Sequence, residues 1–196
     1  MSYYCFIQAR YSSKRLRGKV LKKIGKLTLL EILLKRLKKS KKINKLIVLT
    51  SNTKYDKKIV SLCKINKINY YCGSLNNVFY RFKSAIKKFK PKKIIRISAD
   101  SPLMDWRLVD KMINFSQKNT SYDIITNVEK KTFPKGQSIE ILNSEIFDLS
   151  SNLLTNEQKE HVTKYFYLEN DYKILNYELI KRYNKYNLCI DNYDDY

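Results

Sequence analysis

The chain has 196 residues, a mass of 23.4 kDa and 43% hydrophobic residues, which is enough for one globular domain and excludes a disordered chain. No stretch of 18 consecutive apolar residues occurs, which excludes a membrane-spanning helix. Lysine and arginine outnumber the acids by 40 to 18, but they are spread along the chain, and we attribute most of the net charge of +22 to AT-rich codon usage rather than to a nucleic acid or membrane partner.

The first predicted element is a strand over residues 3–7, and the loop that follows it is strongly basic. Its cations are Arg10, Lys14, Arg15, Arg17 and Lys19. An exposed basic loop after the first strand of an α/β protein is a typical site for anionic ligands, because arginine and lysine bind phosphate oxygens. The alternative is a solvated loop in a lysine-rich protein, because the segment does not follow the phosphate-loop pattern G-x-x-x-x-G-K-[ST].

Strands and helices then alternate up to residue 126. Thr28 and Glu31 form a capping box for a helix that extends to about residue 39. Further strands are predicted over 46–49, 69–72, 93–98 and 122–126, and further helices over 55–65, over 78–89 and after Asp105. This order predicts an α/β fold with a mostly parallel sheet and helices on both faces. After residue 128 the pattern changes to a turn over 132–136, an extended segment over 137–142, a helix over 155–169 and late strands over 172–177 and 188–191.

Two acidic features stand out in this basic chain. Asp100 follows the strand over 93–98, at the sheet edge where α/β proteins bind ligands, and its carboxylate suits a hard cation. The alternative is a plain Asp-Ser-Pro turn. Asp191, Asp194 and Asp195 form an acidic cluster near residue 196, for which a solvated tail is the alternative.

The cysteines and the single histidine exclude a zinc site of the usual spacing. Cys5, Cys63, Cys72 and Cys189 form no C-x-x-C pair, and His161 is the only histidine. Scattered cysteines in apolar runs are typical of reduced core thiols, and no apolar leader precedes the first strand, so we expect a cytoplasmic protein.

Six segments share their order and spacing with one enzyme family. They are 9–21 (ARYSSKRLRGKVL), 73–82 (GSLNNVFYRF), 100–103 (DSPL), 134–140 (PKGQSIE), 159–163 (KEHVT) and 189–195 (CIDNYDD). Together they resemble the cytidylyltransferases that make CMP-activated sugar acids, of the CMP-Kdo synthetase and acylneuraminate cytidylyltransferase types, and above all spore-coat polysaccharide biosynthesis protein F. The sequence departs from the family pattern at Arg17, where proline is usual, at Asn192, where threonine is usual, and at Asn77 and Tyr80, where acids are usual.

The resemblance implies a three-layer, Rossmann-like fold of the nucleotide-diphospho-sugar-transferase type. It divides the single domain 1–196 into a nucleotide-binding core over about 1–127, a small sugar-binding and dimerisation lobe over about 128–180, and a return strand with an acidic metal motif over 187–196. It also implies a homodimer.

The resemblance further implies transfer of CMP from CTP to the anomeric hydroxyl of a 2-keto sugar acid, with release of pyrophosphate, for surface polysaccharide biosynthesis. Arg10, Lys19 and Asp100 would be catalytic, and Asp100 and Asp191 would hold Mg²⁺. The implied nucleotide-binding residues are Ala9, Arg10, Ser13, Arg15, Lys19, Thr50, Ser51, Gly73 and Arg81. The implied sugar-binding residues are Gln137, Glu140 and His161. For Arg81, a place on the helix surface is an equal alternative.

Two other functions stay open at this point. The first is an enzyme of the same fold that uses another nucleotide or a sugar phosphate, because backbone groups that contact a base leave little trace in a sequence. The second is a non-enzymatic nucleic-acid-binding protein, indicated by the charge, although the chain lacks a basic stripe on one helix and an aromatic RNA-binding motif.

Overall fold

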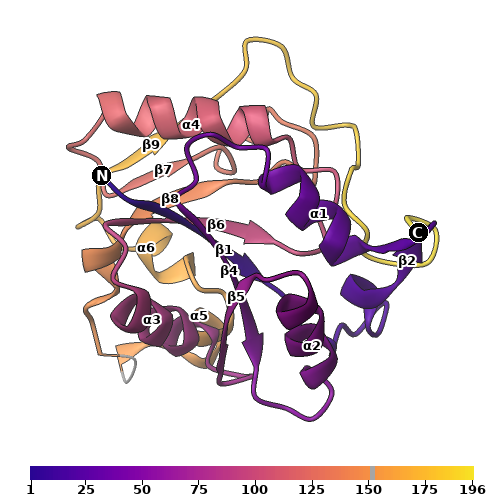
Figure 1. Ribbon diagram of the computed structural model, residues 1–196. Coiled ribbons are helices and arrows are strands. Elements are labelled where there is room, and N and C mark those ends of the chain that lie inside the picture. Colours follow the sequence, from indigo (N-terminus) through magenta and orange to yellow (C-terminus); the bar gives the residue numbers. More distant parts are fainter. Residues whose placement is uncertain (151–152) are drawn as a thin grey trace.

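A seven-stranded sheet runs through the molecule, in the order β5-β4-β1-β6-β8-β7-β9 (Figure 1). The computed structural model describes residues 1–150 and 153–196. The strands are β1 (Tyr3–Gln8), β4 (Lys45–Ser51), β5 (Asn69–Gly73), β6 (Lys93–Ser98), β7 (Ile124–Thr126), β8 (Glu140–Asn143) and β9 (Ile174–Asn176). A separate small ribbon pairs β2 (Lys23–Ile24) with β3 (Leu27–Thr28). Strands β5, β4, β1 and β6 are mutually parallel, whereas β8 is antiparallel to both β6 and β7.

The helices cover both faces of this sheet. They are α1 (Leu29–Leu37), α2 (Lys57–Ile65), α3 (Val78–Phe89), α4 (Trp106–Lys118), α5 (Asn156–Glu160) and α6 (Lys164–Leu168), with short 3₁₀ turns at Lys19–Leu21 and Ser144–Phe147. Alternate residues of β1 face opposite cores, because successive side chains of a strand point to opposite sides. Cys5 and Ile7 pack with α1, α2 and α4, whereas Phe6 packs with α3 and α6.

The sequence correctly predicts the alternation of strands and helices up to residue 126 and the α/β fold class. The capping box at Thr28 is present, and β5 is an edge strand as expected. Residues 128–180, for which the resemblance implies a small lobe, contribute β8 and β9 to the main sheet.

Two predictions about the last third of the chain are wrong. The helix expected over 155–169 is broken into α5 and α6, because His161 leaves the helical conformation and the buried Val162 and Phe166 enter the core. No strand forms over 188–191; one isolated bridge joins Lys135 to Asn187, just before this segment.

The parallel strands all start on one side of the sheet and all end on the opposite side, which we call its amino edge and its carboxyl edge. The carboxyl ends of β1, β4, β5 and β6 lie at one edge, and their amino ends lie at the other. The N-terminus, where β1 starts, lies at the far side of the view from the C-terminus (Figure 1). Among the described residues, no helix is both long enough and apolar enough to cross a bilayer.

Candidate active site

Lys19 is the central residue of the candidate site. Gly18 adopts the left-handed conformation with φ of 69°, and a 3₁₀ turn starts at Lys19. The Lys19 ammonium lies 2.8 Å from Asp100 Oδ2 and 3.0 Å from Asp191 Oδ1. The expectation that Lys19 lies in an exposed loop is therefore wrong: its side chain is only 10% exposed, because the turn directs it inward between two carboxylates.

Asp191 is the most heavily paired carboxylate of the site. Besides Lys19, it accepts a hydrogen bond of 2.7 Å from Lys135 Nζ, and Arg15 Nη2 lies 3.2 Å away. Partial burial alone would raise the pKa of Asp191, but the hydrogen bonds from Lys135 and Lys19 outweigh it and hold this pKa well below its ordinary value. Asp191 is thus an ionised, buried side chain, and a solvated tail does not describe it.

Asp195 has a different position in the acidic cluster. Its carboxylate accepts the backbone N–H groups of Asp191 and Asn192 at 2.8 and 3.1 Å, and the Asn187 side chain donates to it at 2.7 Å. Asp195 therefore closes the turn that holds Asp191 in place. Asp194 is exposed.

Gly136 explains how residues 187–191 reach the sheet edge. Its φ is 91°, and an added Cβ would lie 2.6 Å from the carbonyl carbon of Leu188, a separation that real Cβ atoms do not adopt. The backbone of Ile190 then donates to the Asp100 carbonyl at 2.8 Å. Two distant parts of the sequence are thereby locked together, with Asp100 and Asp191 facing each other.

Lys19, Asp100 and Asp191 line a cavity of about 290 Å³ at the carboxyl edge of the sheet. Its lining includes Gln8, Arg10, Ser13, Lys14, Arg15, Lys19, Ser98, Asp100, Glu160 and Asp191. Arg10 forms an ion pair of 3.4 Å with Glu160, and both side chains are exposed to solvent. The lining combines these cations with the carboxylates of Asp100, Glu160 and Asp191, which suits an anionic ligand that arrives with its own cation.

The two carboxylates fit a hard divalent cation on the chemistry of their donor atoms. Asp100 and Asp191 both reach one point, which the Lys19 ammonium occupies, so that point is already a place for positive charge. No group of three or more His, Cys, Asp or Glu side chains converges among the described residues. A cation held by one or two carboxylates and completed by phosphate oxygens and water is the usual mode for Mg²⁺.

Arg81 marks a second part of the site. It is completely buried, so the helix-surface alternative is wrong. Only its Nη1 donates, to the Ser74 carbonyl at 3.3 Å, whereas Nε and Nη2 have no partner. Burial lowers the pKa of Arg81 to about 10, opposed by the nearby Asp56. Buried donors without partners are rare and call for a ligand or water that completes them.

The residues around Arg81 are tightly packed. An added Cβ on Gly73 would lie 2.9 Å from Arg81 Cγ, so only glycine leaves room for the guanidinium stem. Thr50 Oγ1 is buried without a partner. The Ser51 hydroxyl and the Ser51 N–H both donate to Asp56, and the Ala9 N–H donates to the Leu49 carbonyl. The free hydrogen-bonding groups here are therefore those of Arg81 and Thr50.

Glu140 and His161 line a larger cavity of about 850 Å³ that also contains Asp100 and Asp191. Glu140 forms an ion pair with Arg96 and accepts a hydrogen bond of 2.9 Å from the Tyr167 hydroxyl. Burial and the Glu140 charge raise the pKa of Tyr167, which keeps this hydroxyl a donor. The further cations on the cavity wall are Arg15, Lys131, Lys135 and Lys164.

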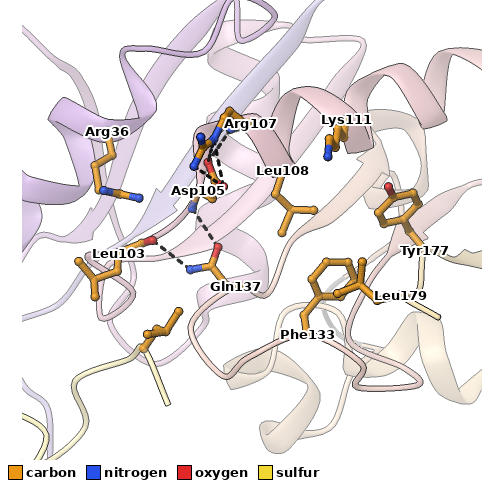
Figure 2. Close-up of a pocket in the computed structure, with 11 residues that line it drawn as sticks. Arg36, Leu103, Asp105, Arg107, Leu108, Lys111, Phe133, Gln137, Tyr177 and Leu179 are labelled. Atoms are coloured by element: carbon orange, nitrogen blue, oxygen red, sulfur yellow. Dashed lines mark hydrogen bonds and ion pairs between the residues drawn. The ribbon is translucent and has the colours of Figure 1, made fainter. Parts of the chain in front are cut away.

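Gln137 does not join this cavity. Its side chain donates to the Leu103 carbonyl at 3.0 Å and accepts from the Asp105 N–H at 2.9 Å (Figure 2). It lines a separate cavity of about 560 Å³ together with Phe133 and Tyr177. The grouping of Gln137 with Glu140 and His161 is therefore wrong, because this side chain is used to hold the start of α4.

Sequence reasoning missed Lys135, Arg96, Tyr167 and Asp56. Lys135 carried a signal, because it stands in the turn before Gly136. Arg96 interrupts the apolar residues Ile94, Ile95 and Ile97 of β6, four residues before Asp100. Asp56 stands at the N-cap position of α2, but its side chain makes no cap hydrogen bond and accepts instead from Tyr11 and Ser51.

Comparison with known proteins gives one family. The family model described as cytidylyltransferase matches residues 4–189. An uncharacterised protein of Methanocaldococcus jannaschii is 38% identical over 162 residues, which is 82% of this chain and 65% of that protein, so the chain spans slightly less than two thirds of its length. Spore coat polysaccharide biosynthesis protein SpsF of Bacillus subtilis is 34% identical over 203 aligned residues, 97% of this chain and 81% of SpsF.

Solved structures agree with this comparison. A cytidylyltransferase from Leptospira borgpetersenii is 31% identical, covers 100% of this chain and 84% of its own, and superposes with a TM-score of 0.95. The CTP complex of CMP:2-keto-3-deoxy-manno-octonic acid synthetase is 14% identical, with 98% and 94% covered and a TM-score of 0.74. The manganese complex of Rv0371c from Mycobacterium tuberculosis is 11% identical, with 100% and 96% covered and a TM-score of 0.66. The last two share the fold.

Proposed function

The chain belongs to the cytidylyltransferase family, a family of nucleotidyltransferases, and from this premise we propose that it transfers CMP from CTP to the anomeric hydroxyl of a 2-keto sugar acid and releases pyrophosphate. The observation that carries the proposal is the convergence of Lys19, Asp100 and Asp191 on one cavity at the carboxyl edge of the sheet. The homodimer, the cytoplasmic setting and the role in surface polysaccharide biosynthesis belong to the same proposal.

In this proposal the basic loop binds the triphosphate. Arg10, Ser13, Arg15 and Lys19 line the 290 Å³ cavity, and their donors can hold the phosphate oxygens that gain charge as pyrophosphate leaves. The base would lie beside Ala9, Thr50 and Gly73, within reach of the unpartnered donors of Arg81. A base that presents ring nitrogen and carbonyl acceptors would complete those donors, and cytosine does so.

Asp100 and Asp191 would hold Mg²⁺ on the phosphates. When bound, such an ion neutralises phosphate charge and orients the α-phosphorus for in-line attack. A fold relative binds manganese, which supports a divalent cation here. The chain's own contribution is positioning: Lys135 and the turn closed by Asp195 fix Asp191, and Lys19 supplies a charge between the two carboxylates.

The acceptor would occupy the 850 Å³ cavity. Its wall carries Arg96, Lys131, Lys135 and Lys164, which suit the carboxylate of a sugar acid. Arg96 Nε is buried without a partner and Glu140 holds the same guanidinium through Nη1. Glu140 and Tyr167 would thus orient Arg96, and His161 would contact the sugar at the cavity mouth.

A substrate panel tests this function. The protein is incubated with Mg²⁺, one nucleoside triphosphate at a time, and Kdo, a nonulosonic acid or a hexose 1-phosphate, and pyrophosphate is measured. We expect pyrophosphate release only with CTP and a 2-keto sugar acid, because hexose 1-phosphates lack the carboxylate and attack through a phosphate oxygen. A chelator should abolish the release.

Each other outcome of the panel contradicts part of the proposal. Release only with a sugar phosphate or with another nucleotide would assign the chain to a different nucleotidyltransferase. Absence of release with every pair, together with salt-sensitive binding to random DNA, would favour a nucleic-acid-binding protein, because phosphate contacts give a steep salt dependence. The Asp100→Asn variant is the control for contaminating pyrophosphatase or transferase activity.

Arg81 allows a second prediction, in which stability and binding change in opposite directions. Arg81→Met keeps most of the side-chain length but removes a buried charge with two unpartnered nitrogens. We expect CTP affinity to fall about 10- to 100-fold, whereas the free energy of unfolding stays the same or rises by about 1 kcal/mol. Calorimetric CTP titration and thermal unfolding measure the two effects.

The control for Arg81→Met is Lys83→Met on the same helix, whose side chain pairs with Asp148 away from the site. It should change neither quantity appreciably. A large loss of stability in Arg81→Met with unchanged CTP affinity would make Arg81 a structural residue.

A further inference from the structure

The positive charge of the chain is concentrated in one third of its length. Residues 32–99, which are 68 of the 196 residues, contain 20 of the 40 lysines and arginines but only one of the 18 acids, Asp56. Codon usage that acted on the whole chain would lower the number of acidic residues evenly along it. The other 17 acids lie outside this stretch, so a compositional cause does not explain the asymmetry.

The fold gathers these lysines at the amino edge of the sheet, opposite the candidate active site. The loops that end α1, α2 and α3 lead directly into β4, β5 and β6, and the parallel pairing places the starts of these strands side by side. We name this surface the basic edge. Its lysines are Lys38, Lys39, Lys41, Lys42, Lys45, Lys64, Lys67, Lys87, Lys88, Lys90 and Lys92. The one acid of the stretch, Asp56, is buried at the other edge beside Ser51.

Contacts across the basic edge show that its loops are neighbours in space. Lys38 Nζ donates to the Asn66 carbonyl at 3.3 Å, which joins the ends of α1 and α2, and Lys38, Lys45 and Lys67 line one hollow. Asn44 donates its backbone N–H to Tyr3, and Lys92 donates its backbone N–H to Ser2, so the loops before β4 and β6 both meet the N-terminal residues.

The basic edge carries unneutralised charge and an exposed apolar side chain, that of Ile65. Within the described part of the chain, none of its eleven lysines forms an ion pair. Two carboxylates among the described residues contact these loops: Asp110 binds Ser40 and the backbone N–H of Lys41, and Glu31 accepts a hydrogen bond of 3.4 Å from the Asn66 side chain. Ile65, at the end of α2 between Lys64 and Lys67, is 80% exposed.

We propose that the basic edge docks the protein on an anionic lipid membrane. Lysines near an anionic bilayer each add to the attraction, and an exposed isoleucine among them can enter the headgroup region. Docking through this edge leaves the opposite edge, with its cavities, facing the solution that supplies nucleotide and acceptor. The proposal departs from the expectation that no membrane is a partner, because that expectation used the spread of lysines along the sequence and not in space.

The composition of the basic edge favours lipid over nucleic acid. It contains lysine and no arginine, whereas base recognition relies heavily on arginine. Its aromatic neighbours are not free to stack on bases, because Tyr4 packs under Lys45 and Tyr71 packs under Lys88, and both rings are partly buried.

Vesicle flotation tests the proposal on the full chain. Phosphatidylcholine vesicles with and without about one third phosphatidylglycerol are compared at low and physiological salt. Two variants carry the same loss of charge: Lys38→Gln, Lys41→Gln, Lys64→Gln and Lys67→Gln on the basic edge, and Lys111→Gln, Lys173→Gln, Lys181→Gln and Lys185→Gln elsewhere. All eight side chains are exposed, so both variants should keep the wild-type thermal unfolding.

We expect binding only to the anionic vesicles, weakened by salt, with the partition coefficient roughly tenfold or more lower in the basic-edge variant and changed less than about twofold in the matched control. Ile65→Ser should lower it further. Equal losses in the two quadruple variants, or salt-sensitive binding to random DNA without vesicle binding, would overturn the proposal. Pyrophosphate release in solution should be the same in all variants, so this test is independent of the proposed reaction.

Discussion

Asp191→Asn is expected to lower kcat/KM for the CTP-dependent reaction by about a thousandfold or more, with the fold intact. The substitution keeps the shape of the side chain but removes the hard anionic oxygens that a divalent cation requires, and the same cation would be shared with the phosphates in the transition state. Asp100→Asn should have an effect of similar size, because both carboxylates meet the same point at the sheet edge. Excess Mg²⁺ should restore neither variant fully.

Steady-state pyrophosphate release measures this effect, and two variants in the same acidic cluster are its controls. Asp194→Asn changes an exposed side chain and should be nearly silent. Asp195→Asn weakens the turn that positions Asp191 and should cause a smaller loss. If Asp191→Asn is silent and Asp195→Asn is not, the assignment within the cluster is wrong.

The same variant makes a prediction for stability against pH. The folded pKa of Asp191 lies below the value of an unfolded aspartate, so its charged form stabilises the fold. This contribution is complete above the unfolded pKa, about 3.9, and is lost as the pH falls towards the folded pKa. Thermal unfolding should therefore show Asp191→Asn to be less stable than the wild type at neutral pH, and the difference should shrink in acid.

The sequence was sufficient for the elements that depend on local patterns. The capping box at Thr28, the apolar strands up to β6 and the position of Asp100 after β6 all follow from hydrophobic periodicity and from the rule that parallel strands end at one edge. The motif order then identified the family, because spacing survives substitutions such as the arginine at position 17.

The features that could not be predicted from the sequence depend on contacts between residues that are far apart in the chain. The late strand was expected from the apolar residues 188–190, but the close approach of Leu188 to Gly136 places them against a loop rather than a sheet. The inward direction of Lys19 depends on Gly18 and on two carboxylates more than 80 residues away. The role of Gln137 depends on Leu103 and Asp105, which no spacing rule connects to it.

The site geometry also predicts the order in which the divalent cation and CTP bind. The Lys19 ammonium lies between Asp100 and Asp191, at the position that the cation would take. A divalent cation bound as proposed would therefore have to displace an existing counterion, and the triphosphate would offer that ammonium a new partner. We expect weak cation binding to the free protein and strong binding once CTP is present.

Lys19→Met tests the two roles of the ammonium, as counterion of the two carboxylates and as a partner of the triphosphate. It removes the ammonium but keeps a flexible chain of similar length, so Asp100 and Asp191 face each other without their common counterion. We expect a loss of about 2 to 4 kcal/mol in transition-state stabilisation, the range for a preorganised charge contact. In metal-free buffer the variant should also be less stable than the wild type, because two like charges then lie close together in a partly buried site.

Manganese tests whether the Lys19 ammonium occupies the position that the cation would take. Added to Lys19→Met without nucleotide, Mn²⁺ should raise the thermal unfolding temperature, because the vacated position between the two carboxylates accepts the cation. The wild type should respond to Mn²⁺ mainly when CTP is present. Arg10→Ala is the matched control, since Arg10 lines the same cavity but pairs with Glu160 and not with the carboxylates: it should lose activity without gaining a response to Mn²⁺. If Mn²⁺ stabilises the nucleotide-free wild type as strongly as Lys19→Met, Lys19 does not hold the cation position, and the order of binding inferred from its two ion pairs is wrong.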